Sequence, residues 1–310
     1  MPAIVILDAH TTNPGDQSWD SIAALGDLTV YDHTLPGQVV ECAQGAEIVL
    51  SNKTLLGRAE IEALPKLRYI GLLSTGYNVV DLSAARKRNI PVTNIPAYST
   101  DGVAQQTFAL LLELTNRTQR HADSVRAGDW SGCRDFCYWL SPLAQLAGKT
   151  MGIIGYGRIG QAAAGIARAF GMNVLAYDPI QTLDSLEAVL RGSDIVSLHC
   201  PLTPETQNLI RRETLAMMKP GAILINTARG PVINEADAAE ALHSGQLGAL
   251  AADVLSTEPP PANNPLLTAP NCMITPHISW ATQEARARLI GIAAENIQAF
   301  LKGEAVNVVN

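Results

Sequence analysis

The sequence GIIGYGRIG contains glycines at a spacing that is suited to binding a phosphate group. Gly155, Gly157 and Gly160 form the pattern G-x-G-x-x-G. In this pattern the first glycine permits a tight turn, the second lets the chain approach a pyrophosphate, and the third lets a helix lie close to a strand. Backbone N–H groups at the start of that helix would donate hydrogen bonds to the phosphate oxygens. We therefore expect a dinucleotide site here, with Arg158 and Ile159 among its contacts.

Asp178 strengthens this interpretation. It ends a second strand-like segment, 173–177, and follows the last glycine by close to the roughly 20 residues that are typical of a carboxylate bound to the adenosine ribose. An ordinary strand-to-helix turn would account for the glycines alone, but not for an acidic residue at this spacing. The carboxylate would repel a 2′-phosphate, and residues 179–181 supply no cation that compensates for it. NAD is therefore the expected cofactor rather than NADP.

Strand-like and helix-like segments alternate along the chain, which is typical of parallel sheets with crossover helices. A first series of expected strands covers residues 3–7, 28–31, 48–51, 69–72 and 91–93. A second series covers residues 150–154, 173–177, 195–198, 222–226, 249–254 and 272–275. The expected fold class is therefore α/β, with two doubly wound parallel-sheet domains.

Two long helices are expected to cross between these domains. The first carries Ala104, Phe108, Leu111 and Leu112 at helical spacing. The second has one apolar stripe, made of Leu289, Ile290, Ala293, Ile297, Phe300 and Leu301. If the second helix returns to the first domain, that domain consists of residues 1–100 plus 283–310 and the other of residues 101–282.

The composition limits the partners of the chain. A net charge of −7 with no long basic cluster argues against a nucleic-acid partner. The sequence enters a strand pattern directly and has no apolar run of membrane-spanning length, so a cytoplasmic protein without a membrane partner is expected. Five scattered cysteines form neither a disulfide framework nor a metal-ligand pattern, so free thiols and no metal site are expected.

The segment 130–139 is dense in aromatic residues, including two tryptophans. An aromatic patch in a connecting arm indicates either a subunit interface or a small local core. The sequence alone leaves both alternatives open.

Several further motifs resemble those of the NAD-dependent D-2-hydroxyacid dehydrogenases, and the resemblance extends over essentially the whole chain. They are STGYNVVD at 74–81, PVTNIPAYST at 91–100, LHCPLTPET at 198–206, INTARG at 225–230, ADVLSTEPP at 252–260 and TPHISWAT at 275–282. The resemblance implies a flavodoxin-like substrate domain, a Rossmann domain that binds NAD, and a homodimer.

The same resemblance implies a catalytic set of Arg229, Glu258 and His277. Reduction of a 2-keto acid needs a hydride at C2, a proton at the carbonyl oxygen, and a fixed carboxylate. The planar guanidinium of Arg229 would hold the carboxylate and the carbonyl oxygen together. His277 would donate the proton, and Glu258 would orient its ring by accepting a hydrogen bond from one nitrogen. Each residue also has an ordinary structural interpretation, but all three follow expected strands of the second sheet, at the edge where such sheets bind ligands.

The remaining site residues are also implied by the resemblance. Further cofactor contacts are expected at Thr75, Cys200, Pro201, Thr206, Thr227, Ala228 and Asp253, together with Arg229 and His277. Substrate contacts are expected at Asn52, Ser74, Thr75, Gly76, Arg229, His277 and Trp280. His199 also follows a strand, but we do not expect it to be the acid, because its neighbours resemble a cofactor-lining segment.

Tyr77, Asn78 and Trp280 resemble the glycerate-type branch of the family. The resemblance therefore implies reduction of hydroxypyruvate or glyoxylate to D-glycerate or glycolate. Reduction of pyruvate to D-lactate is an alternative within the same chemistry. An alternative of another class is an NAD-sensing scaffold, similar to the corepressors built on this fold.

Overall fold

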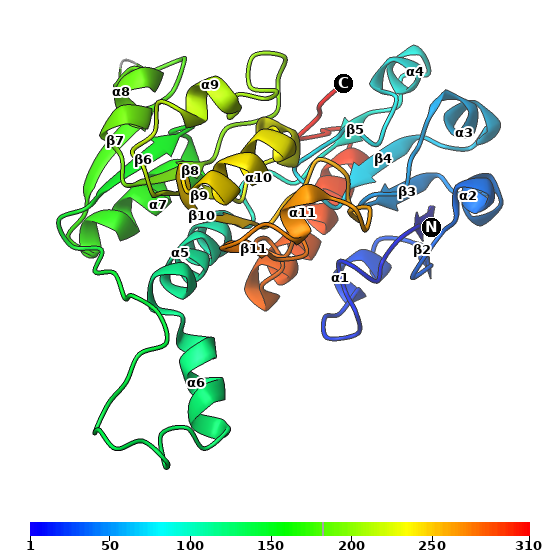
Figure 1. The fold of residues 1–310 in the computed structure, drawn as a ribbon. Helices are drawn as coiled ribbons and strands as arrows, with labels where there is room; N and C mark the ends of the chain where they lie inside the picture. The colour runs from blue at the N-terminus through cyan, green and yellow to red at the C-terminus, as the bar shows by residue number, and fades with distance from the viewer. Residues whose placement is uncertain (182) are drawn as a thin grey trace. The chain divides into compact units, whose positions relative to one another are not determined.

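The computed structural model describes residues 1–181 and 183–310 (Figure 1). It divides into two compact units. The first consists of Met1–Ser99 and Ala281–Asn310, and the second of Thr100–Trp280.

The first unit is a parallel sheet of five strands in the order β2-β1-β3-β4-β5. The strands are β1 (Ala3–Ile6), β2 (Asp27–Val30), β3 (Ile48–Ser51), β4 (Tyr69–Leu72) and β5 (Val92–Thr93). The helices are α1 (Asp20–Ala23), η1 (Pro36–Gln38), α2 (Val39–Cys42), α3 (Arg58–Ala63), α4 (Leu82–Lys87) and α11 (Gln283–Leu301). This strand order is that of flavodoxin-like sheets, and it places a switch point between β1 and β3.

Two of the central strands of this sheet, β3 and β4, are buried along their whole length. All four residues of β3 and of β4 are buried, as is typical of parallel strands that are covered on both faces. At one edge, Val308 bridges to Thr93, and the N–H of Val309 donates to the carbonyl of Val92 at 2.8 Å. The end of the described chain therefore covers the edge of β5.

Helix α11 differs from the predicted apolar stripe at two kinds of position. Leu301 is 42% exposed, because it is the last residue of the helix and extends beyond the packed face. Arg286 and Asn296 are buried although they are polar. The guanidinium of Arg286 pairs with both carboxylate oxygens of Asp16 at 2.6 Å, and Asn296 donates to the carbonyl of Asn94 at 3.1 Å. These partners satisfy the polar groups that the helix buries.

The second unit is a parallel sheet of six strands in the order β11-β10-β9-β8-β6-β7. The strands are β6 (Thr150–Ile154), β7 (Asn173–Tyr177), β8 (Ile195–Leu198), β9 (Ala222–Asn226), β10 (Leu247–Ala252) and β11 (Cys272–Ile274). The helices are α5 (Thr100–Asn116), α6 (Thr118–Arg126), α7 (Arg158–Ala169), α8 (Leu186–Gly192), α9 (Arg212–Leu215), η2 (Gly230–Val232), α10 (Glu235–Ser244) and η3 (Pro265–Leu267). The predicted α/β class with two parallel sheets is confirmed.

Alternate residues of the second sheet enter two different cores. In β9, Leu224 packs in a core with α8, α9 and α10, whereas Ile225 packs in a core with α5 and α7. In β10, Leu250 and Ala251 are divided in the same way. Helices therefore cover both faces of the sheet, and the carboxyl ends of its strands are left as the edge at which a ligand can bind.

An arm made of α6 and the loop 127–145 leaves this sheet (Figure 1). Its aromatic side chains do not form a local core: Trp130 is 51% exposed, Phe136 89% and Trp139 69%. Tyr138 is the better-packed aromatic residue, and its hydroxyl lies 2.9 Å from that of Ser124. The structure therefore disfavours the local-core alternative for this segment.

Within the described residues, no helix is both long and apolar enough to cross a membrane. The same part of the chain contains no cluster of three or more side chains suited to holding a metal ion. All five cysteines are free.

Candidate active site

The glycine loop connects β6 to α7. Gly155 has φ +92°, which is strained for other residues, and a Cβ there would lie 2.5 Å from the backbone nitrogen of Cys200. A Cβ at Gly160 would lie 2.1 Å from the carbonyl oxygen of Gly155. A Cβ at Gly157 would contact nothing within 4 Å. The first and third glycines thus allow close packing, while the second leaves open space beside the backbone.

The open space lies beside backbone donors. In the described part of the chain, the N–H groups of Gly157, Arg158 and Ile159 have no protein acceptor. They belong to the N-terminus of a helix of 12 residues, where unpaired N–H groups and the helix dipole favour an anion. The residues present therefore fit the pyrophosphate of a dinucleotide.

Asp178 follows β7 directly and faces this loop. One carboxylate oxygen accepts from the N–H of Tyr156 at 2.9 Å, and the other accepts from the N–H of Ile180 at 3.0 Å. Each carboxylate oxygen can accept a second hydrogen bond, so these contacts leave capacity for ribose hydroxyls. The carboxylate thus connects the end of β7 to the glycine loop.

The segment after β8 borders the same loop. Burial lowers the pKa of the His199 imidazole to about 4 and raises the pKa of the Cys200 thiol to about 11. His199 is therefore neutral at pH 7, and its Nε2 lies 2.9 Å from the hydroxyl of Ser197. The Thr206 hydroxyl donates to the carbonyl of Pro201 at 2.6 Å, which closes the segment into a turn. Both side chains are therefore uncharged near pH 7, which suits a segment that would contact uncharged parts of a cofactor.

Arg229 lies in the loop between β9 and η2, and it is exposed. The side chain of Asn226 holds this loop by accepting from the N–H of Ala228 at 3.0 Å and donating to the carbonyl of Arg229 at 2.9 Å. One guanidinium nitrogen of Arg229 donates to the carbonyl of Ala228 at 2.7 Å. The hydroxyl of Thr227 is buried and lies 3.1 Å from that of Thr107.

Glu258 and His277 form a hydrogen-bonded pair. The Nδ1 atom of His277 lies 2.6 Å from one carboxylate oxygen of Glu258, with side-chain exposures of 31% and 36%. The other carboxylate oxygen accepts from the N–H of Leu255 at 3.0 Å. A carboxylate accepts hydrogen bonds only, so Nδ1 carries a proton and Nε2 is the ring nitrogen left for a ligand.

The three expected catalytic residues follow three adjacent strands of the second sheet. Arg229 follows β9, Glu258 follows β10 and His277 follows β11, and these strands are neighbours in the order β11-β10-β9. Neighbouring strands lie about 5 Å apart, and the carboxyl ends of parallel strands meet at one edge. The loops also pack closely, because a Cβ at Gly230 would lie 1.9 Å from the backbone of Leu255.

Asp253, an expected cofactor contact, also binds the turn that carries His277. It is 1% exposed, and both of its carboxylate oxygens accept hydrogen bonds from the turn that carries His277. Trp280 ends the second unit just beyond this turn and is half-buried.

The expected substrate residues of the first unit follow β3 and β4. Asn52 is buried, and its amide donates to the hydroxyls of Thr11 and Thr12, so its amide nitrogen is used inside the unit. The hydroxyl of Ser74 donates to the carbonyl of Gly76 at 2.7 Å, and that of Thr75 to the carbonyl of Ile95 at 2.8 Å.

The backbone of this loop has free donors. The N–H groups of Thr75 and Gly76 have no acceptor among the described residues. Two successive free N–H groups suit a carboxylate. The loop therefore offers its backbone, rather than its hydroxyl groups, to an anion.

Two acidic residues that position loops were not identified from the sequence. Asp8 accepts from the N–H groups of Asn52 and Thr54 at 2.7 and 2.8 Å, and it also binds the N–H of Lys53. Glu235 accepts from the N–H of Ser256, in the loop that carries Glu258. The available signal was an acidic residue two positions after a strand, for Asp8, or at the first position of a helix, for Glu235.

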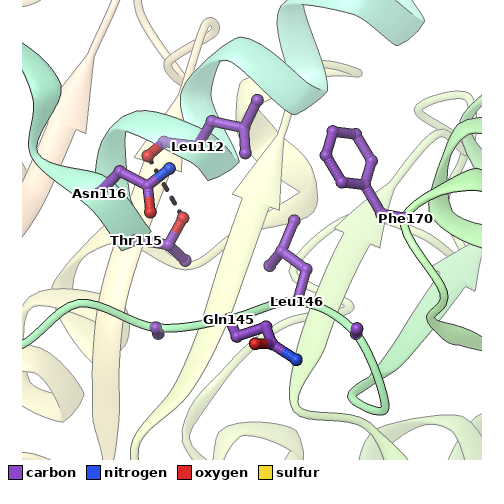
Figure 2. Close-up of a pocket in the computed structure, with 8 residues that line it drawn as sticks. Leu112, Thr115, Asn116, Gln145, Leu146 and Phe170 are labelled. Atoms are coloured by element: carbon purple, nitrogen blue, oxygen red, sulfur yellow. Dashed lines mark hydrogen bonds between the residues drawn. The ribbon is translucent and has the colours of Figure 1, made fainter.

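A pocket elsewhere in the second unit does not involve the site (Figure 2). Its volume is about 280 Å³, and Leu112, Leu146 and Phe170 point into it. The loop 144–147 and Phe170 precede β6 and β7, so the pocket lies toward the amino ends of these strands. None of the expected site residues lines it.

Comparisons with known proteins agree with this geometry. Residues 108–279 match the family model described as D-isomer specific 2-hydroxyacid dehydrogenase, NAD binding domain. The chain is 48% identical to a hydroxypyruvate reductase of Blautia hydrogenotrophica, with 99% of each chain covered. It is 43% identical to a glycerate dehydrogenase of Methylorubrum extorquens, with 90% of each covered. The crystal structure of the TT0316 protein from Thermus thermophilus superposes with a TM-score of 0.87 at 36% identity, covering 99% of this chain and 100% of that one.

Proposed function

Because the chain belongs to the D-isomer specific 2-hydroxyacid dehydrogenases, which use NAD, we propose that it reduces hydroxypyruvate to D-glycerate and glyoxylate to glycolate. The observation that carries the proposal is the hydrogen bond between His277 and Glu258, at the carboxyl edge of the sheet that contains the glycine loop. Relatives named hydroxypyruvate reductase and glycerate dehydrogenase support this choice of substrate.

The cofactor is NAD. We assign its pyrophosphate to the free N–H groups that begin α7, and its adenosine ribose to Asp178. When bound, NADH supplies the hydride that adds to C2 of the keto acid.

Arg229 binds the substrate in this proposal. Its guanidinium has five N–H donors, of which one contacts the carbonyl of Ala228. The remaining donors form a planar fork that matches a carboxylate and an adjacent carbonyl oxygen. Arg229 thereby orients C2 and stabilises the negative charge that develops on the carbonyl oxygen.

His277 supplies the proton. Glu258 accepts a hydrogen bond from Nδ1–H and so orients the ring, and Nε2 donates its proton to the carbonyl oxygen as the alkoxide forms. The neutral ring then takes a proton from solvent. In the reverse direction the same nitrogen accepts the hydroxyl proton.

The first unit has an anion site of its own. We assign it to the N–H groups of Thr75 and Gly76, which suit a carboxylate. The substrate contact that we predicted for Asn52 stays a prediction, and its amide nitrogen also donates to the hydroxyls of Thr11 and Thr12.

The experiment is NADH oxidation with hydroxypyruvate, glyoxylate and pyruvate, measured for the wild type, His277→Ala and His243→Gln. His243 is exposed on α10 and serves as the matched control. We expect turnover of hydroxypyruvate and glyoxylate, a loss of roughly 10²- to 10⁴-fold in kcat for His277→Ala, and normal kinetics for His243→Gln. A wild type that binds NADH but reduces none of the three acids would favour the NAD-sensing scaffold instead.

We also propose that the arm forms the interface of a homodimer. Large apolar side chains are exposed along it, including Val125, Leu140 and Leu143 besides the aromatic residues. Contiguous exposed apolar surface of this kind is typical of a protein interface.

A cytoplasmic location is part of the proposal. It is supported by the five free cysteines, since reducing compartments keep thiols unpaired.

A further inference from the structure

The loop that carries Glu258 is anchored at its two ends. Leu255 is 6% exposed and Leu266 is 2% exposed, and both pack in the core that contains α10. Every residue of the segment 256–263 between them is exposed, Glu258 included. Burial of side chains therefore does not determine where Glu258 lies, and the contacts at the two ends of the segment have to do so.

One carboxylate binds both ends of this segment. Glu235 is the first residue of α10, and one of its carboxylate oxygens accepts from the N–H of Ser256 at 2.6 Å. The other accepts from the side-chain amide of Asn264 at 2.8 Å. The amide oxygen of Asn264 accepts in turn from the N–H of Leu266 at 3.0 Å, at the start of η3. Glu235 thereby closes the segment between Ser256 and Asn264 into a loop.

The stiffness of the segment transmits this constraint to Glu258. The run 259–261 directly after it consists of three prolines, and each proline ring fixes its own φ. The N–H of Asn264 donates to the carbonyl of Pro261 at 2.9 Å, so the run continues into the anchored end. A displacement of that end would therefore move the Glu258 carboxylate away from Nδ1 of His277, which lies 2.6 Å from it.

We propose that Glu235 is a positioning residue for the reaction: by binding both ends of the segment 256–264, it holds Glu258 against His277. The start of α10 also follows the Arg229 loop through η2, so the same side chain fixes one catalytic loop relative to the other. Both carboxylate oxygens of Glu235 already have donors, so it acts through Glu258 rather than by touching substrate. This inference rests on the proposed roles of Glu258 and His277.

The first variant is Glu235→Gln. A glutamine keeps the shape of the side chain but turns an NH₂ group toward one of the two donors, so one end of the segment is released. We expect kcat to fall by roughly tenfold, because the pair of Glu258 and His277 is misplaced, while the dissociation constant of NADH changes less than about twofold. An unchanged kcat would show that Glu235 does not position the pair, and the inference would be wrong.

Two aspartates of the same unit serve as controls. Asp237 lies two residues further along α10, where its carboxylate accepts from the N–H of Arg212 at 2.9 Å. Asp194 lies at the amino ends of the strands, where its carboxylate accepts from the N–H of Thr150 at 2.8 Å. Asp237→Asn and Asp194→Asn should both keep the wild-type kcat. Equal losses in Glu235→Gln and Asp237→Asn would indicate general destabilisation of α10 and overturn the inference.

A second substitution should restore what the first removes. When Glu235→Gln is combined with Asn264→Asp, the new amide can donate to the new carboxylate, and the remaining oxygens can still accept from the N–H groups of Ser256 and Leu266. The double variant should recover kcat to within about threefold of the wild type. Asn264→Asp alone places two carboxylates side by side and should lower kcat at least as much as Glu235→Gln. If the two losses instead multiply in the double variant, these hydrogen bonds do not position the loop.

A double-mutant cycle with Glu258→Gln shows whether the effect passes through Glu258. Once Glu258→Gln has weakened the bond to His277, Glu235→Gln should lower kcat by less than about twofold further. A full tenfold loss in that background would mean that Glu235 acts on another part of the site, which overturns the inference.

An NMR measurement separates this inference from the proposed function. In protein with ¹⁵N-labelled histidine, the ring nitrogens of His277 are identified by their absence in His277→Ala. At a pH where the ring is neutral, the bond to Glu258 keeps the proton on Nδ1, so this tautomer should dominate in the wild type and in Asp237→Asn. Glu235→Gln should shift the ring toward the Nε2–H tautomer, and adding Asn264→Asp should reverse the shift, whether or not the protein reduces any of the acids.

An unchanged tautomer in folded Glu235→Gln refutes the inference. If that variant does not fold, Glu235→Asp keeps the charge at the start of α10 but shortens the side chain by one methylene, so it cannot reach both donors. The tautomer of His277 should then shift in the same direction, and an unchanged tautomer in Glu235→Asp refutes the inference equally.

Discussion

The carboxylate of Asp178 accepts a hydrogen bond from the N–H of Tyr156 at 2.9 Å, so the residue assigned to the ribose also holds the glycine loop. This relationship gives the residue two separable effects. One is electrostatic, because its charge disfavours a 2′-phosphate. The other is structural, because it satisfies a loop N–H.

Asp178→Ala should therefore weaken NADH binding and relax the preference for NADH over NADPH. We expect the ratio of kcat/KM for NADPH to that for NADH to rise by roughly tenfold, because the repulsion of a 2′-phosphate is removed. Initial rates with each cofactor measure the ratio, and Asp194→Asn is the control. If kcat/KM falls equally for NADH and NADPH, Asp178 only stabilises the glycine loop and does not select the cofactor.

Arg229→Lys should lose most activity although it keeps the positive charge. An ammonium cannot reproduce the planar fork, so kcat/KM should fall by roughly 10²-fold or more, which corresponds to about 3 kcal/mol. Steady-state kinetics with hydroxypyruvate provide the measurement. Arg212→Lys, which alters a surface pair with Glu240, should behave like the wild type. Near-normal kinetics of Arg229→Lys would show that the substrate does not depend on two parallel hydrogen bonds from the guanidinium.

Gly160→Ala should destabilise the second unit, whereas Gly165→Ala on the same helix should not. The added Cβ at Gly160 would meet the carbonyl oxygen of Gly155 at 2.1 Å, but at Gly165 it would meet nothing within 4 Å. We expect a loss of about 1–3 kcal/mol for the first and a gain of about 0.5–1 kcal/mol for the second. Chemical unfolding in urea compares them. Equal stabilities would show that α7 does not lie on the loop as closely as described.

His199 should make stability depend on pH between about 6.5 and 4. Its pKa in the folded chain is about 4, below the ordinary value of 6.5 that an unfolded chain would have. As pH falls through this window the unfolded chain binds a proton that the folded chain excludes, so the free energy of unfolding falls by up to about 3 kcal/mol. His199→Gln should lose this component, and His243→Gln should keep it. Parallel pH profiles for His199→Gln and the wild type would contradict the burial of this ring.

Replacing Phe136 and Trp139 together by serine should shift the chain toward monomer. Both side chains are exposed on the arm, and an interface that buries such residues loses its central contacts when they are removed. Light scattering after size-exclusion chromatography measures the mass. Leu55→Ser removes an exposed leucine of the first unit and should not change it. A wild type that is monomeric at all concentrations would disprove the proposed dimer.

Apolar runs with clear ends allowed most strands to be predicted. The bounds predicted for β3, β4, β6, β7, β8 and β9 agree with the structure. Strand β10 was predicted as 249–254 but covers Leu247–Ala252. The shift has a local reason, because a bulge lies between Leu247 and Ala249, where Gly248 breaks the apolar pattern, and Asp253 turns away into its own contacts.

The site was predictable as residue types but not as a network of hydrogen bonds. The spacing of the glycines and of Asp178 indicated the dinucleotide site, and motif resemblance indicated His277 with Glu258. What could not be predicted is which backbone N–H groups a carboxylate satisfies, since those partners are not encoded by residue type. The turn contacts of Asp253 depend on such pairings, and the burial of Arg286 depends on a side-chain pair with Asp16 that is equally invisible in the sequence.

Residues 281–310 complete a unit that begins at Met1, whereas the second unit is one continuous stretch of chain. During synthesis every residue of the second unit therefore leaves the ribosome before α11 exists. Until then, residues 1–99 lack the helix and the tail that cover β4 and the edge of β5, and this uncovered sheet is the surface that a chaperone would have to shield.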